Sequence, residues 1–359
     1  PPPLPSAPPS TPPLPPSQPL RKSCDEPLRF MHQQKAAGMS MRGRLQKYGA
    51  EHDIPSFFGQ MSSTLRSGFC DLGHARWSFT DSRPWCRDQP QTAWISMVRD
   101  PWERMKSAFY YCEWQWQRAK VVCAGCAQDL HGHFGLLDPI CNVGPLAGST
   151  PAARACEFAR RWGLNYQFEY YIHLDYEQIR ALPCAPPDSE CPAHKSPLNS
   201  RNHKEEVGMR DHSCLRRAIR ACRFDSNQTA ASKALIADAF RAQESLLAVG
   251  IVEEWAASLQ LFERVTKCGG LASDAYVADE LHESFKRTDP AAVASAESEL
   301  ETCRADVTTN YMDVDYALYA HARSLFREQR RGVHGQRSWP LGAPLTCTQS
   351  SAVDPVACA

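Results

Sequence analysis

The chain has 359 residues, 43% of them hydrophobic and 9% aromatic, which suits one large domain with appendages or two domains of ordinary size. Lys plus Arg and Asp plus Glu both number 40, so the formal net charge is zero. Global charge therefore gives no argument for binding nucleic acid or a membrane, and a polyanionic partner would need a local basic patch.

Cysteine is unusually frequent, with 16 residues scattered along the chain. The even number and wide scatter favour disulfides in an oxidising compartment, and the alternative is a reducing compartment with mostly buried thiols. A single N-glycosylation sequon, Asn227–Thr229, is consistent with a secretory route. The sequence contains no run of 18 apolar residues, so we expect no transmembrane helix within it. Because the chain begins without Met, we expect a trimmed or fragmentary product, so the absence of a membrane anchor or signal peptide does not argue against a secretory route.

The first 20 residues are dominated by proline, with serine and leucine. Such a composition favours extended polyproline conformations and cannot bury a core. We therefore expect a stalk or linker over residues 1–26, with a ligand for a proline-binding domain as the alternative.

Two strand–loop–helix units are predicted in the first third of the chain. The apolar run Leu28–His32 predicts a strand, Gln33–Gly38 a loop, and Ser40–Tyr48 a helix that ends at Gly49. The second unit has a buried strand over Thr92–Val98. Two such units favour a parallel sheet.

The second unit continues with Asp100 and Pro101, a helix cap followed by proline at the first helical position, and then a helix over Trp102–Arg118. From about residue 151 the pattern is mostly helical, with a late strand at Leu247–Ile251. The expected helices are Ala152–Arg161, Tyr176–Ala181, Cys214–Cys222, Ala231–Phe240, Trp255–Lys267, Ala291–Arg304 and Tyr316–Arg330. We predict an α/β fold with a central parallel sheet and a helix-rich C-terminal half over residues 27–332, followed by an irregular tail, 333–359.

The loop after the first strand has the composition of a phosphate cradle. Its small residues let backbone N–H groups approach an anion, the following helix start adds a positive dipole end, and Lys35 adds a charge. The candidate binding residues are Lys35, Ala36, Ala37, Gly38, Met39 and Ser40. The loop is not a Walker A motif, and taken alone a surface loop with a lysine explains it better.

A second candidate site follows the second strand. Arg99 lies at the carboxyl end of that strand, where ligands bind in open α/β sheets. Ser107 lies two turns into the next helix, and Arg104 shares its helical face. An arginine and a hydroxyl that converge there suit a phosphate monoester. The alternative is a capping arginine and a surface serine.

Together these segments resemble a known family. Lys35–Ser40, with the sequence K-A-A-G-M-S, looks like the 5′-phosphosulfate loop of Golgi carbohydrate sulfotransferases. Arg99–Ser107 matches the family's 3′-phosphate motif, R-D-P-x-x-R-x-x-S, in full. Gly73–Trp77, Asn165–Phe168 and Val249–Phe262 resemble further family segments in the same order. The chain is thus similar, over roughly residues 28–330, to heparan sulfate 2-O- and 6-O-sulfotransferases.

The resemblance implies a P-loop-like strand–loop–helix and a donor substrate, 3′-phosphoadenosine-5′-phosphosulfate (PAPS), with no metal. It implies that Lys35 stabilises the leaving phosphate, that Arg99 and Ser107 hold the 3′-phosphate, and that His74 is the base. Glu51 and His52 are weaker candidates for the base.

The chain departs from the family pattern at three places. Met39 replaces a small hydroxyl residue, Gln33-Gln34 replaces Ile/Val-Pro, and Val252 replaces Thr. Met39 removes one side-chain phosphate contact, although Ser40 could supply another.

The expected acceptor is a carbohydrate hydroxyl, on a polyanionic glycan as one option, with no nucleic acid partner. The expected location is the Golgi lumen, as a fragment of a type II membrane protein, or outside the cell. Two alternatives stay open: a tyrosine or small-alcohol acceptor, and an inactive lumenal binding protein on the same scaffold.

Two other features have competing interpretations. Cys123-Ala124-Gly125-Cys126 is a CxxC sequence that could form half of a zinc site or a redox pair, and ordinary disulfides are the preferred interpretation. Residues 194–223 are rich in Arg, Lys and His, which suits either a sulfated or uronate-bearing glycan or a plain solvated surface.

Overall fold

The computed structural model describes residues 23–24, 26, 28–31, 33, 35–54, 56–58, 69–71, 93–122, 141, 146, 148, 150–162, 167–168, 171, 230–276 and 290–332. The strands are β1 (Leu28–Met31), β2 (Ser56–Phe58), β3 (Phe69–Asp71), β4 (Ala93–Val98) and β5 (Ala248–Ile251). The helices are α1 (Gly38–Glu51), α3 (Pro101–Val122), α4 (Pro151–Trp162), α7 (Ala230–Glu244), α8 (Trp255–Thr266), α10 (Pro290–Asn310) and α11 (Asp313–Arg330), with short 3-10 helices at Val252–Glu254 and Asp274–Tyr276.

The strands form one open parallel sheet in the order β2-β3-β1-β4-β5. The chain leaves β1 toward β2 and β3 on one side, and leaves β4 toward β5 on the other side. The strand order therefore reverses between β1 and β4, which makes their carboxyl ends the topological switch point where open α/β sheets bind ligands.

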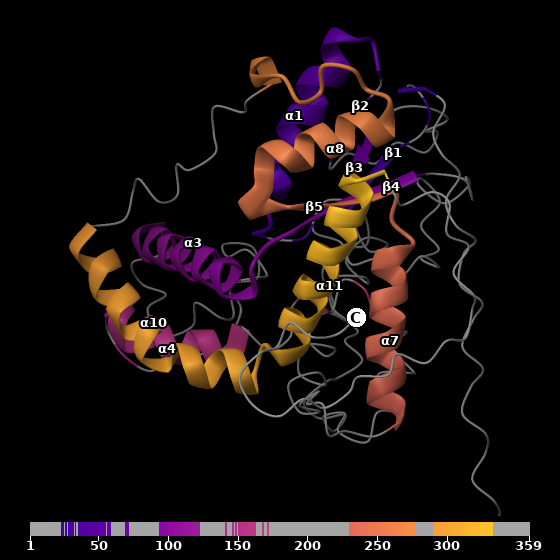
Figure 1. Cartoon of the computed structure of the whole chain (residues 1–359). Coiled ribbons are helices and arrows are strands. Elements are labelled where there is room, and N and C mark those ends of the chain that lie inside the picture. Colours follow the sequence, from indigo (N-terminus) through magenta and orange to yellow (C-terminus); the bar gives the residue numbers. More distant parts are fainter. Residues whose placement is uncertain are drawn as a thin grey trace, which may run out of the picture.

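Helices cover both faces of the sheet (Figure 1): α1 and α8 lie on one face and α7 lies on the other. Helix α11 runs along the free edge of β5, where the Gln329 side chain accepts a hydrogen bond from the Val249 N–H at 3.0 Å and donates one to the Leu247 carbonyl at 3.5 Å. This contact satisfies backbone groups that an edge strand would otherwise expose.

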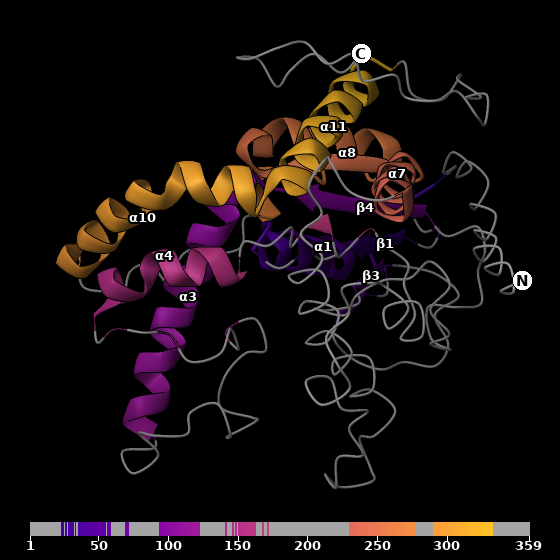
Figure 2. The ribbon, with the colours of Figure 1, turned by 90° about the horizontal axis from the view of Figure 1, so that it is seen from below.

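A helical layer stands beyond the carboxyl end of the sheet, where α3 follows β4 and packs with α4 and α10 (Figure 2). A bidentate ion pair joins α4 to α3, with Arg154 Nε and Nη2 at 2.9 and 2.6 Å from the two carboxylate oxygens of Glu113. The Cys156–Cys303 disulfide joins α4 to α10.

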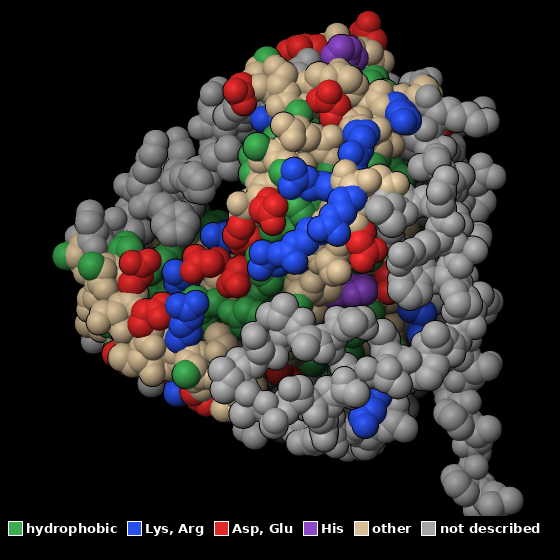
Figure 3. Space-filling model, in the orientation of Figure 1, with side chains coloured by type: hydrophobic (Ala, Val, Ile, Leu, Met, Phe, Trp, Pro, Cys, Tyr) green, Lys and Arg blue, Asp and Glu red, His purple; other side chains and the backbone are tan. Residues whose placement is uncertain are grey.

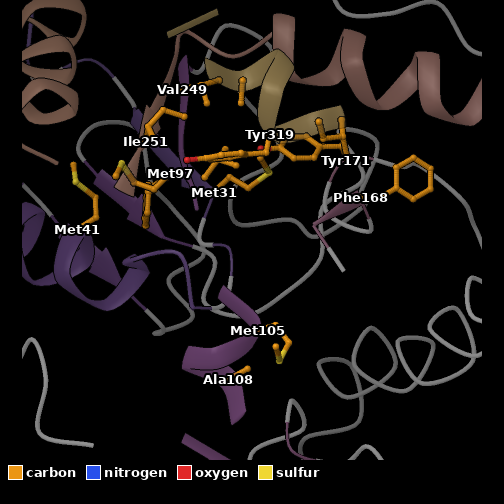
Figure 4. Packing of buried hydrophobic residues seen from close by; sticks show 14 of the residues in the cluster. Met31, Met41, Met97, Met105, Ala108, Phe168, Tyr171, Val249, Ile251 and Tyr319 are labelled. Atoms are coloured by element: carbon orange, nitrogen blue, oxygen red, sulfur yellow. The ribbon is translucent and has the colours of Figure 1, made fainter. Parts of the chain in front are cut away.

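The core lies between the sheet and its helices. In Figure 4, apolar side chains of β1, β4 and β5, among them Met31, Met97 and Val249, lie in one cluster with Tyr171 and with Tyr319 of α11. Continuous burial along β4 and β5 is typical of strands covered on both faces. Gly250 is needed in β5 because a Cβ there would lie 2.4 Å from the Met97 Sδ.

Three disulfides, Cys24–Cys268, Cys112–Cys141 and Cys156–Cys303, confirm the prediction that cysteines pair. They indicate an oxidising, secretory-type environment. Among the described residues, no helix combines the length and apolarity needed to cross a membrane.

Most predicted elements are confirmed. The three expected strands and both strand–loop–helix units are present, and five of the expected C-terminal helices appear with ends that differ from the prediction by up to six residues. The predicted helix end at Gly49 is wrong, because α1 continues to Glu51 and the chain turns at Asp53, whose φ is 54°. Residues 1–22 of the expected stalk, the tail, the CxxC sequence, the basic stretch 194–223 and the helices expected at 176–181 and 214–222 lie outside the described residues. Near the end of the expected stalk, Cys24 is described and forms the disulfide with Cys268.

Candidate anion-binding site

The loop between β1 and α1 makes a tight turn at the switch point. Its Ala36 N–H donates to the Gln33 carbonyl at 3.2 Å, and the first helical hydrogen bond of α1 runs from Met41 N to Ala37 O at 3.0 Å. Gly38 and Ser40 are buried in the first turn of the helix. The loop therefore brings the start of α1 close to the end of β1.

Two residues of this loop have left-handed backbone conformations without being glycine. Lys35 has a φ of 62° and Ala37 a φ of 54°. The other such residues in the described chain, Asp53 and Lys267, follow the ends of helices, where this conformation is usual. Before a helix it costs on the order of 1 kcal/mol per residue and is typical of functional sites.

The N-termini of α1 and α3 differ in how their N–H groups are satisfied. In α3, Asp100 Oδ1 accepts hydrogen bonds from the N–H groups of Trp102 at 3.0 Å and Glu103 at 3.1 Å. In α1, the N-cap residue is Ala37, which makes no side-chain cap hydrogen bond. A carboxylate of the chain thus already occupies the start of α3, whereas the start of α1 suits an external anion.

Arg99 connects the loop after β4 to the loop after β1. Its Nη1 lies 3.4 Å from the Lys35 carbonyl oxygen, and its own carbonyl accepts a hydrogen bond from Gln167 Nε2 at 2.7 Å. Burial lowers the pKa of Arg99, and nearby carboxylates, led by Glu253, offset part of that shift. Arginine stays protonated near neutral pH, so this half-buried guanidinium supplies a fixed positive charge beside the loop.

Helix α3 forms one wall beside the loop. The Lys35 Nζ lies 3.2 Å from the centre of the Tyr111 ring, a cation–π contact. Ser107 is half-buried one turn before Tyr111, on the same helical face. Arg104 is buried, with its guanidinium carbon 5.4 Å from the centre of the Trp162 ring.

A buried polar cluster forms the floor between β1 and β4. Gln33 Nε2 donates to the Tyr171 hydroxyl at 2.5 Å and lies 3.3 Å from Ser96 Oγ, which donates to the Met31 carbonyl at 3.1 Å. Burial raises the pKa of Tyr171 to about 12, so this hydroxyl is neutral under physiological conditions. The cluster ties the end of β1 to β4 and to the 167–171 segment.

Helix α11 holds two further segments against the site. The Asp315 carboxylate accepts hydrogen bonds from the Gln167 N–H at 2.8 Å and from the Phe168 N–H at 2.7 Å. Glu253, which follows β5, accepts from the Asp100 N–H at 3.0 Å and from the Tyr319 hydroxyl at 2.9 Å.

Four of the five sequence segments that were singled out therefore meet at one place. Those that contain Lys35, Arg99, Gln167 and Glu253 contact one another or share a contact at the carboxyl edge of the sheet. The fifth segment, with His74, lies outside the described residues.

The two weaker base candidates are far from the loop. Glu51 and His52 lie at the opposite end of α1, about 20 Å from its start given 1.5 Å per residue over 14 residues. His52 instead stacks on Tyr48, with the ring centres 4.2 Å apart. This position disfavours both as bases that act beside Lys35.

Sequence reasoning missed several residues of this site. Tyr111 and Tyr171 carry no motif, and Asp315 lies within an ordinary amphipathic helix. The only signal for Gln33 was its departure from the family pattern, and its burial shows that this amide is a structural anchor. These contacts join residues up to 148 positions apart, so local spacing could not reveal them.

The residues around the loop between β1 and α1 are suited to bind an anion that carries more than one charged group. It combines a helix start, the Lys35 ammonium and the Arg99 guanidinium, with the Ser107 hydroxyl on the facing helix. Among the described residues, no group of three or more His, Cys, Asp or Glu side chains is placed to hold a metal ion.

Comparison of the chain with protein-family models, with curated proteins and with solved structures finds no match. A function for this chain is therefore inferred from its own residues and their geometry.

Proposed function

We propose that the chain is a sulfotransferase that moves a sulfuryl group from PAPS to a carbohydrate hydroxyl. The observation that carries this proposal is the meeting of the Lys35 loop and Arg99 at the switch point, where Arg99 Nη1 lies 3.4 Å from the Lys35 carbonyl. Open parallel sheets bind nucleotides at this place.

PAPS carries phosphate groups at two ends, and the site offers two cationic positions, one for each end. The start of α1 and Lys35 would bind the 5′-phosphosulfate in a P-loop-like strand–loop–helix. Arg99 and Ser107, which belong to the following unit, would bind the 3′-phosphate. The different capping of α1 and α3 supports this division, because Asp100 already occupies the start of α3.

The proposed reaction is an in-line displacement at sulfur. The acceptor oxygen forms a bond to sulfur while the bond between sulfur and the phosphate oxygen breaks, and the nucleotide leaves with the bonding electrons. Lys35 would stabilise the charge that develops on that phosphate oxygen. The hydroxyl proton passes to a base, for which His74 is the candidate, because a neutral imidazole accepts a proton near neutral pH.

Lys35 would have to leave Tyr111 to reach a phosphate. An ammonium stacked on a ring is only weakly held, at about 0.5–1 kcal/mol where water has access. A phosphate with charge-assisted contacts competes well against this, so the cation–π contact supports a side chain that is pre-positioned at the loop.

The oxidising environment indicated by the disulfides supports a Golgi lumenal or secreted enzyme, where glycan hydroxyls are abundant. A tyrosine or small-alcohol acceptor would use the same donor site. An inactive protein would bind the nucleotide without transferring the sulfuryl group. This alternative is included in the test because Met39 stands where the family has a small hydroxyl residue.

Calorimetry with the desulfated product, 3′-phosphoadenosine-5′-phosphate, tests the donor site. We expect one site per chain, with binding weakened by about ten- to a hundredfold in Arg99→Ala, since a charge-assisted hydrogen bond contributes about 1.5–3 kcal/mol. Lys47→Ala, at the far end of α1, is the matched control and should bind as the wild type does. Absence of binding in the wild type, or equal losses in both variants, would refute the proposal.

The role of His74 has a separate test. His74→Ala should lose sulfuryl transfer while keeping its affinity for the desulfated nucleotide. Loss of nucleotide binding in this variant would show that His74 has a structural role instead.

A further inference from the structure

A concentration of positive charge lies on α8 and α11 (Figure 3). We call it the α8–α11 basic track, and its members are Arg264, Lys267, Arg323, Arg327, Arg330 and Arg331. Residues 323–331 contain four arginines and one glutamate, although the whole chain has zero net charge. The track is therefore a local basic patch of the kind that a polyanion requires.

The arginines of α11 share one side of the helix. Arg323, Arg327 and Arg330 are spaced by four and three residues, which places them one above the other. Glu328 points to a different side, where Ser324 Oγ lies 3.5 Å from its carboxylate. The acidic residue within the run therefore does not interrupt the row of cations.

The fold fixes part of the track and leaves the rest exposed. Arg264 donates hydrogen bonds to the Arg330 carbonyl at 2.9 Å and to the Gln329 carbonyl, which joins the ends of α8 and α11. Arg330 lies 3.7 Å from the Glu254 carboxylate, an exposed ion pair of small energy. Arg327 and Arg331 are exposed to solvent.

The track begins beside the candidate site. The Arg323 guanidinium carbon lies 5.9 Å from the centre of the Tyr319 ring, and the Tyr319 hydroxyl donates to Glu253, which also binds the Asp100 N–H. From Arg323 to Arg331 the helix rises about 12 Å. A polymer that follows the track would thus have one end near Arg99 and the other at the far end of α11.

We infer that the α8–α11 basic track binds an anionic glycan and leads one end of it toward the site at Lys35 and Arg99. This inference rests on the proposed function for the identity of the bound chain as acceptor. Charge alone would also suit a nucleic acid. The disulfides favour the glycan, because anionic polysaccharides are the polyanions of secretory and extracellular compartments.

The test measures binding of a heparin oligosaccharide to the full chain at several salt concentrations. The track variant is Arg327→Glu with Arg331→Glu, and the control variant is Lys47→Glu with Lys233→Glu, exposed cations of α1 and α7. Both variants change the net charge equally. We expect the track variant to bind about tenfold more weakly at 0.1 M salt, with a slope of log affinity against log salt that is smaller by about two. The control should stay within about twofold of the wild type.

Equal losses in the two variants would overturn the inference, because they would show that net charge alone governs binding. Single-stranded DNA that binds the wild type as tightly as heparin of equal charge would overturn the choice of a glycan. Affinity for 3′-phosphoadenosine-5′-phosphate, measured on the same variants, should not change. If that nucleotide fails to bind while heparin binding depends on the track, the proposed function fails and the glycan surface stands.

Discussion

Asp315 of α11 should contribute more to stability than its place on a helix indicates. Its buried carboxylate accepts hydrogen bonds from two backbone N–H groups, those of Gln167 and Phe168, at 2.8 and 2.7 Å. A hydrogen bond to a charged group contributes about 1.5–3 kcal/mol. Asp315→Asn keeps one acceptor oxygen but turns an amide N–H₂ toward the second N–H. The variant should therefore lose about 2–4 kcal/mol of unfolding free energy.

Urea unfolding followed by circular dichroism measures this loss, and amide hydrogen exchange should show weaker protection at Gln167 and Phe168. Asp306→Asn is the matched control, because it removes a carboxylate from an exposed ion pair: Asp306 Oδ2 lies 3.0 Å from Arg160 Nε, and both side chains are 43% exposed. Such a pair contributes about 0.2–1 kcal/mol. An Asp315→Asn variant that loses no more stability than the control would refute the role assigned to Asp315.

Three other predictions concern the fold. Gly250→Ala should lose about 1–3 kcal/mol in urea unfolding, because the new Cβ would meet Met97 Sδ at 2.4 Å; an unchanged midpoint would contradict the packing of β5. Burial raises the pKa of Tyr171 to about 12, so its neutral form stabilises the fold fully below about pH 10 and this contribution is lost as pH rises to 12. Between pH 9 and 12, the unfolding free energy of Tyr171→Phe should therefore fall by about 2 kcal/mol less than that of the wild type, as measured by urea unfolding at each pH. Equal losses in the two proteins would contradict the burial of the Tyr171 hydroxyl. Glu113→Gln should lose about 3–5 kcal/mol of unfolding free energy, because the substitution leaves the Arg154 charge without its carboxylate partner. A loss below about 1 kcal/mol in urea unfolding would contradict the assignment of a buried ion pair.

The strands that position the site were predictable because their burial is continuous in sequence. Thr92–Val98 and Leu247–Ile251 are mostly apolar runs, and the structure has strands over Ala93–Val98 and Ala248–Ile251. The helix start at Asp100-Pro101 was also predictable, since the carboxylate that caps α3 is local to it. The short strands β2 and β3 were missed, because three residues carry too little periodicity to be distinguished from a loop.

The candidate site was predictable only as separate segments. Spacing in sequence identified Lys35, Arg99 and Ser107 as residues suited to phosphate, but not that Arg99 would reach the Lys35 carbonyl. That contact depends on the strand order, which places β1 beside β4 although β2 and β3 come between them in the chain. The left-handed conformation of Ala37 was equally invisible, because alanine gives no turn signal.

Transfer of labelled sulfuryl groups from PAPS to a panel of glycans tests the central claim most directly. The wild-type chain should label at least one anionic glycan, and Lys35→Ala should lose most of that turnover because charge on the leaving phosphate is no longer stabilised. No labelled product from a wild-type chain that binds 3′-phosphoadenosine-5′-phosphate, or a Lys35→Ala variant that keeps the wild-type rate, would contradict the account.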